Sequence, residues 1–386
     1  MLSHLQADRI RAAELDSQIT ALERSLSALR VQKTLVQGRL NSYKYPVLDL
    51  PNEIVSEIFI HFLPVYPKCP PSAGILSPTN LTHICRKWRE IASATPMLWR
   101  ASALPLRPSL SFAQQAGETD HWLRRSRSCP ISIEIVEDYC EATKPDGWAS
   151  EVLAVLDAHR GRWEHLKLHF GAVPPLITFE RSMPLLRHLS LAFDEIHHHS
   201  SFPVVFGKTP LLRSVSLNYL ATREVILPWA QLTSLELVSV FPKDCVAVLQ
   251  QTFNLVHCQL TLFESRDMDL LDVTLPRLET LRLLGFMNHR AIGYLGTFFV
   301  PALRELRIPE QFLENPIEFL TSFISKSGCH LREVHITGER TVPKQTYCTT
   351  FPSIRFHFHP RHVHQISNGE SSETEAGSSS DSSDNF

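Results

Sequence analysis

Apolar residues recur at helical spacing near the start of the chain and at strand spacing through most of the remainder. Over residues 3–41 they follow a seven-residue repeat with two apolar positions in each repeat. One position holds Leu15, Leu22, Leu29 and Val36, and the other holds Leu5, Ala12, Ile19, Leu26, Lys33 and Leu40. This pattern predicts a coiled-coil helix that pairs with a second copy of the chain, giving a homodimer. A helix folded back on its own chain is the alternative.

Residues 46–104 predict a small set of helices. Pro51 fits the first position of a helix, and two apolar groups fall at helical spacing, which are Ile54, Ile58 and Phe62, then Leu81, Ile84, Cys85, Trp88, Ile91 and Ala92. A third, short helix begins at Pro96 and carries Leu98 and Trp99. The second group reads as one helix that begins at Ser77 and Pro78, a cap residue followed by proline. So few helical residues make a poor core alone. The two tryptophans therefore predict a surface for an obligate partner.

A short apolar pattern, L-x-x-L-x-L with substitutions, recurs from residue 163 onward. Its central residues are Leu166, Leu189, Val215, Leu235, Cys258, Leu281, Leu306 and Val334. They are separated by 23, 26, 20, 23, 23, 25 and 28 residues. Such a period predicts a solenoid that stacks one short strand per repeat. Leucine clustering by chance is the alternative.

The predicted fold class is α/β. A coiled-coil helix at 3–41 precedes a small all-α unit at 46–104, a proline- and serine-rich link begins at Pro105, and an irregular solenoid spans 112–364. The stretch from 351 to 364 reads as a last strand or an irregular cap. Residues 367–386 hold five acids and no base, which predicts a disordered acidic tail. The tail reads as a solubilising segment, with phosphorylation by acidophilic kinases as the alternative.

Strand alternation turns the residues on either side of each central position away from the core and onto the concave face of the solenoid. These pairs are His165 and Lys167, His188 and Ser190, Ser214 and Ser216, Ser234 and Glu236, His257 and Gln259, Thr280 and Arg282, Glu305 and Arg307, and Glu333 and His335. Charge is densest at the C-terminal end, so the candidate target-binding residues are Arg282, Arg307, Glu305, Glu333 and His335. We expect the two arginines to hold an acidic or phosphorylated segment. A merely solvated face is the alternative.

Three short motifs carry a family resemblance. The Leu-Pro-x-Glu-Ile sequence from Leu50, the Cys-x-x-Trp-x-x-Ile-Ala sequence from Cys85 and the Pro-x-Leu-Trp sequence from Pro96 resemble the F-box motif. The later repeats resemble irregular leucine-rich repeats, and the whole chain resembles the expanded F-box families of mushroom-forming fungi. Two features depart from these patterns. Residues 64–76 form a long insertion, and no repeat has the usual asparagine after its strand.

The resemblance implies a substrate-recognition subunit of an SCF ubiquitin ligase. Its F-box would bind the Skp adaptor, and through it a cullin, while the repeats hold an unknown target protein. The implied adaptor-binding residues are Leu50, Pro51, Ile54, Ile58, Ile84, Trp88, Leu98 and Trp99. Such a subunit is not an enzyme. The alternatives are a scaffold that never presents a substrate and, less favoured, a repeat protein with an unrecognised catalytic site.

Composition excludes several other classes. A net charge of −2 predicts no bulk attraction to nucleic acid or to an anionic membrane. The 8 cysteines include no C-x-x-C pair, which is typical of reduced thiols in the cytoplasm or nucleus. The N-terminus has no signal-peptide pattern, and no apolar run is long enough to cross a membrane. We therefore expect a protein of the cytoplasm, the nucleus or both.

Two apparent ligand motifs fail on inspection. Gly207-Lys208-Thr209 lacks the earlier glycine of a phosphate-binding loop and is followed by proline. The histidines at 197–199 and at 357, 359, 362 and 364 are candidate metal ligands. Because we find no carboxylate partner near them, we expect no metal site and no cofactor.

Overall fold

The computed structural model describes residues 2–42, 46–106, 111–137, 150–172, 181–195, 204–264, 271–286 and 291–360. Several predictions lie outside this part of the chain, namely those on the histidines at 197–199, 362 and 364 and on the acidic tail at 367–386. Within it, the fold is mixed α/β, with a long N-terminal helix and one large parallel sheet.

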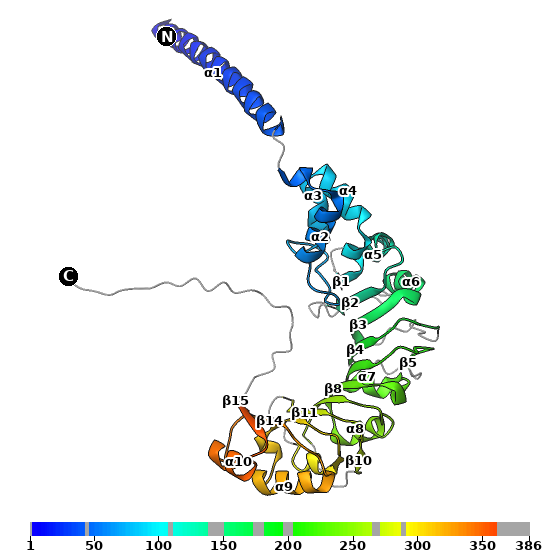
Figure 1. Ribbon diagram of the computed structural model, residues 1–386. Coiled ribbons are helices and arrows are strands. Elements are labelled where there is room, and N and C mark those ends of the chain that lie inside the picture. Colours follow the sequence, from blue (N-terminus) through cyan, green and yellow to red (C-terminus); the bar gives the residue numbers. More distant parts are fainter. Residues whose placement is uncertain are drawn as a thin grey trace, which may run out of the picture.

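The first element is α1 (Leu2–Ser42), which extends away from the remainder of the molecule (Figure 1). This confirms the predicted long helix over 3–41. Residues 4–42 are all exposed, so the apolar positions of the seven-residue repeat pack against nothing in the described chain. None of the described helices is long and apolar enough to cross a membrane.

A cluster of short helices follows. It comprises η1 (Pro46–Asp49), α2 (Asn52–Phe62), α3 (Pro78–Ile84), α4 (Arg86–Ala94) and η2 (Pro96–Trp99). The prediction of one helix through the second apolar group is wrong, since α3 ends before Cys85. That residue is extended, with φ −155° and ψ 169°, and its Sγ accepts the backbone N–H of Trp88 at 3.4 Å. Cys85 therefore caps α4 as a new helix, and the apolar stripe is divided between two helices.

The helical cluster has its own small core, which joins it to the rest of the molecule. Val55, Phe59, Leu98 and Trp99 are each 1% exposed, and Trp122 of α5 (Phe112–Arg125) packs with them. The indole N–H of Trp122 donates to the Trp99 carbonyl oxygen at 3.0 Å, and the two rings meet edge to face at 5.0 Å. A residue from beyond the predicted all-α unit thus completes its core.

Eleven parallel strands form the large sheet. In spatial and chain order they are β1 (Ala101–Leu106), β2 (Ile131–Glu137), β3 (Trp163–Ala172), β4 (His188–Glu195), β6 (Ser214–Asn218), β8 (Ser234–Val240), β9 (His257–Leu262), β11 (Thr280–Gly285), β13 (Glu305–Pro309), β14 (Glu333–Thr337) and β15 (Arg355–His359). Each central residue of the repeated pattern lies in one of these strands and is nearly fully buried. The predicted succession of short strands is confirmed, and β15 makes the stretch after 351 a strand.

Helices, turns of 3-10 helix and short strands form the layer behind the sheet. The helices are α6 (Ser150–Ala158), α7 (Tyr219–Glu224), α8 (Pro242–Leu249), α9 (Pro316–Ser327) and α10 (Lys344–Thr350). The 3-10 turns are η3 (Arg160–Arg162), η4 (Trp229–Gln231), η5 (Tyr294–Thr297) and η6 (Glu310–Phe312). Two small parallel sheets pair β5 (Val204–Val205) with β7 (Val225–Ile226) and β10 (Val273–Thr274) with β12 (Phe298–Phe299). The large sheet lines the inner side of a curve, with α8 and α9 on the outer side (Figure 1).

This curvature has a simple physical cause. Paired strands lie about 4.8 Å apart, whereas packed helices need about 8–10 Å between their axes. Repeats that carry a strand on one side and bulkier elements on the other therefore bend toward the strands. The bend turns the non-core face of the sheet into an extended concave surface.

The edge strand β1 extends into the segment that was predicted to be a link. Pro105, expected to begin a loop, lies inside β1, because an edge strand tolerates a residue without an N–H group. The insertion at 64–76 lies against this edge, where the Pro70 carbonyl oxygen accepts the N–H of Ala103 at 3.2 Å and Pro71 bridges to Ala103. The helical cluster and the sheet are therefore continuous in structure.

Candidate functional site

An apolar surface lies on the outside of the helical cluster. The side chains of Ile54 and Ile58 on α2 are both 49% exposed, and Ile84 at the end of α3 is 55% exposed. A neighbouring face of α2 carries Val55 and Phe59 into the cluster core, so the apolar surface of α2 extends beyond the part that is buried. A helix that is apolar beyond its own core predicts a partner on the outer face.

The structure divides the predicted adaptor-binding residues into three groups. Pro51, Ile54, Ile58 and Ile84 are exposed, Leu50 and Trp88 are half-buried, and Leu98 and Trp99 are buried. Trp88 lies edge to face with Phe59 at 4.9 Å, and the Trp99 indole donates to the Ala92 carbonyl oxygen at 2.8 Å. Leu98 and Trp99 thus hold the helices together, while the exposed residues are accessible to a partner.

The insertion at 64–76 contacts the start of the large sheet. The Tyr66 hydroxyl donates to Glu164 on β3 at 2.7 Å, and the Arg100 guanidinium stacks on the Tyr66 ring at 3.9 Å. Ser132 on β2 donates through its hydroxyl to the Pro67 carbonyl oxygen at 2.8 Å. The insertion does not project freely, and its structural effect is to attach the cluster to the sheet.

Two rows of polar side chains cross the concave face. The first row, one residue before each central position, is His165, His188, Ser214, Ser234, His257, Thr280, Glu305, Glu333 and Arg355. The second row, one residue after it, is Lys167, Ser190, Ser216, Glu236, Gln259, Arg282, Arg307, His335 and His357. Both rows are in register from strand to strand, as the strand alternation predicts.

The C-terminal part of these rows carries the densest charge, with alternating sign. Arg282 pairs with Glu305 at 3.1 Å, and Arg355 pairs with Glu333 at 2.8 Å. Between these pairs lies Arg307, whose Nε is buried and has no hydrogen-bond partner in the described chain. A buried donor without a partner is costly unless a ligand supplies an acceptor. The predicted target-binding residues are therefore brought together, and Arg307 has unused donor capacity.

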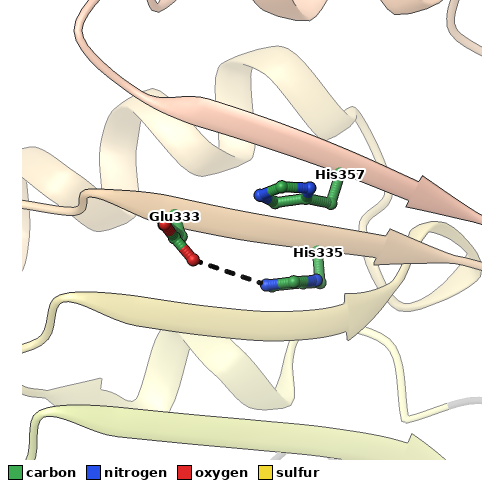
Figure 2. A group of neighbouring side chains, drawn as sticks. All are labelled: Glu333, His335 and His357. Atoms are coloured by element: carbon green, nitrogen blue, oxygen red, sulfur yellow. Dashed lines mark ion pairs between the residues drawn. The ribbon is translucent and has the colours of Figure 1, made fainter.

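Four ligand-type side chains gather beyond Arg307. His335 Nε2 lies 4.0 Å from Glu333 Oε2 on the same strand, and its ring stacks on His357 of β15 at 4.6 Å (Figure 2). His335 Nδ1 lies 3.1 Å from His359 Nε2. The expectation of no carboxylate neighbour is wrong for His357, because the register of β14 with β15 places it beside His335 and close to Glu333. Sequence separation between 333 and 357 concealed that proximity.

Burial affects the protonation of the histidines on this face. Desolvation is the main cause that lowers the pKa of His335, and the charges of His357 and Arg307 act in the same direction while Glu305 opposes it. Desolvation also lowers the pKa of His188, together with the nearby His165 and Lys167. These imidazoles are therefore held neutral, as hydrogen-bonding or ligand groups.

Some members of the concave surface were not predicted from the sequence. Arg355 and His357 continue the two rows on β15, and Glu134 of β2 pairs with Lys167 at 2.6 Å at the opposite end. The alternation of polar and apolar residues in 355–359 was the available signal for the C-terminal pair. A scan against protein-family models and a search of curated proteins each found no match for this chain.

Proposed function

We propose that this protein is the substrate-recognition subunit of an SCF-type ubiquitin ligase, with an F-box at 46–104 that binds the Skp adaptor. The observation that supports it best is the exposed apolar surface of Ile54, Ile58 and Ile84 on a helical cluster whose motifs resemble an F-box. Large apolar side chains at the centre of an interface usually provide most of its binding free energy. The adaptor would in turn connect the chain to a cullin.

In this proposal the eleven-stranded sheet belongs to a leucine-rich-repeat solenoid that holds the target protein on its concave face. Arg282, Arg307, Glu305, Glu333 and His335 are the proposed contacts. Arg307 supports this assignment because its buried Nε has no partner in the described chain. An acidic or phosphorylated segment would supply acceptors suited to a guanidinium. Catalysis would rest with other ligase subunits, and recruitment would raise the local concentration of target lysines.

A pull-down of the Skp adaptor by the full-length chain tests the first part of the proposal. The double variant Ile54→Asp Ile58→Asp places two charges in the proposed interface and should abolish adaptor capture. The matched control is Ile75→Asp, because Ile75 is 78% exposed in the loop that precedes α3. Circular dichroism should show folded protein in both cases. Undiminished capture by the folded double variant would overturn the adaptor assignment.

A scaffold that never presents a substrate would pass that test, so a second measurement separates the two functions. A ligase receptor should bring down the cullin with the adaptor, and its bound partner should accumulate when the proteasome is inhibited. A scaffold should show neither the cullin nor the accumulation.

We further propose that α1 pairs two copies of the chain, since its apolar seam is exposed from Leu5 to Leu40.

A further inference from the structure

The cluster at the C-terminal end of the concave face has the composition of a transition-metal site. Glu333 and His335 lie two residues apart on β14, so strand alternation places both on the same face. His357 lies beside His335 on β15 in the aligned register. One ligand atom from each of the three residues lies within 4.8 Å of the others, and Figure 2 shows the rings of His335 and His357 one above the other, with Glu333 beside His335.

The contacts around His335 leave its Nε2 available to bind a metal ion. Its Nδ1 lies 3.1 Å from His359 Nε2, so one of these nitrogens carries the shared proton. If the proton is on Nδ1, the Nε2 lone pair of His335 is directed toward Glu333. A metal-bound histidine commonly donates its second N–H to a neighbouring acceptor, which fixes its tautomer and orientation. His359 is placed to be that acceptor.

The carboxylate of Glu333 is similarly divided between two roles. Arg355 donates to its Oε1 at 2.8 Å, while Oε2 faces His335 Nε2 at 4.0 Å. The arginine thus orients the carboxylate and leaves one oxygen for a cation. Arg355 and Arg307 also bring positive charge near the cluster, partly balanced by Glu305, and this charge weakens the attraction for a cation.

We propose that Glu333, His335 and His357 form a binding site for a divalent transition metal such as Zn²⁺, with His359 as the positioning residue for His335. Two imidazoles and one carboxylate are a ligand set suited to such ions. Metal–nitrogen bonds of about 2.0–2.1 Å would draw tetrahedral ligand atoms to roughly 3.3 Å apart. Side-chain rotation of the half-buried residues can supply that contraction. The site would leave a coordination position open for water or for a group of a bound partner, and it does not rest on the proposed function.

Binding of Zn²⁺ or Co²⁺ alone to the full-length chain tests the site. The chain should carry no polyhistidine tag, and the histidines at 197–199, 362 and 364 should be alanine in every sample, because they are potential adventitious ligands. Equilibrium dialysis with metal analysis should give one ion per chain. The Co²⁺ form should show the visible absorption of a site with nitrogen ligands. Absence of saturable binding in this background would overturn the proposal.

Single variants then identify the ligands. His335→Ala, His357→Ala and Glu333→Gln should each abolish saturable binding, whereas His359→Phe, which keeps an aromatic ring, should weaken it on the order of tenfold. The matched control is His188→Ala, because His188 is a half-buried histidine of the same face that contacts the Ser214 hydroxyl and has no carboxylate contact among the described residues. Its affinity should be unchanged. Equal losses in His188→Ala and His335→Ala, or retention of binding in the three ligand variants, would overturn the site.

Discussion

The hydroxyl of Tyr66 donates a hydrogen bond to Oε2 of Glu164 over 2.7 Å, across 98 residues of sequence. Tyr66 lies in the insertion between α2 and α3 of the helical cluster, and Glu164 lies on β3. The Tyr66 ring also lies edge to face with His165 at 5.5 Å. Burial is the main cause that raises the pKa of Tyr66, so the phenol stays protonated and remains a donor at physiological pH. The insertion thereby attaches the cluster to the sheet.

Tyr66→Phe removes this hydrogen bond while keeping the ring. We expect the free energy of unfolding to fall by about 1–2 kcal/mol, because a half-buried carboxylate loses a donor. Chemical denaturation of the full chain measures the change. Tyr219→Phe is the control, since the Tyr219 hydroxyl accepts an exposed hydrogen bond from Arg223, its one hydrogen bond within the described residues. An equal loss in both variants would show that the Tyr66 bond has no special role.

Substitution should reduce stability far more at Trp99 than at Ile58. Trp99 is 1% exposed and its indole is hydrogen-bonded within the cluster, so Trp99→Ala should reduce the free energy of unfolding by about 3–5 kcal/mol. Ile58→Ala changes an exposed side chain and should alter stability by less than about 0.5 kcal/mol. Thermal unfolding compares the two variants. Full stability of Trp99→Ala would contradict the assignment of Trp99 to the core.

The exposed seam of α1 should drive self-association. Leu22 and Leu26 are 69% and 48% exposed and occupy the two apolar positions of the seven-residue repeat. Sedimentation of the full chain at micromolar concentration should therefore give a dimer, and Leu22→Glu Leu26→Glu should give a monomer. Leu35→Glu is the control, because Leu35 is 64% exposed but lies off the seam. A monomeric wild-type chain would contradict the prediction.

Charge reversal on the concave face should separate target capture from adaptor binding. Arg282→Glu Arg307→Glu should abolish capture of an acidic or phosphorylated target and leave adaptor capture intact. Proximity labelling followed by pull-down with the identified target provides the measurement. Arg304→Glu is the matched control, because Arg304 is exposed and directly precedes β13 outside both polar rows. Loss of capture only after changes to the convex loops would show that the wrong face was assigned.

Acid should destabilise the fold through three half-buried histidines. Desolvation lowers the pKa of His165, His188 and His335 in the folded chain below the usual value of 6.5. As pH falls below about 6.5, the unfolded chain therefore takes up protons that the folded chain does not, and stability decreases. Denaturation between pH 7 and pH 5 should show this slope, and His188→Gln should reduce it. The exposed His257→Gln is the control, and an equal effect there would refute the mechanism.

The local pattern and repeat period of apolar residues determined many of the helices and strands of this protein. The spacing of leucines was sufficient for α1 and for eight of the strands, because helical and strand periodicities are properties of neighbouring residues. The same alternation was sufficient for both polar rows from His165 to His335. Helical spacing also identified the cluster of short helices. Helical spacing did not predict the break between α3 and α4 at Cys85, since a cysteine side chain is an uncommon cap.

Tertiary structure alone decided which of those side chains meet or remain exposed. The motif resemblance put Ile58 and Trp99 in the same predicted surface, and only packing against Trp122 distinguishes the buried residue from the exposed one. Similarly, Glu333 and His357 are 24 residues apart and become neighbours only through the pairing of β14 with β15. Periodicity specifies the face on which a residue lies, whereas strand register and packing between distant segments specify its neighbours.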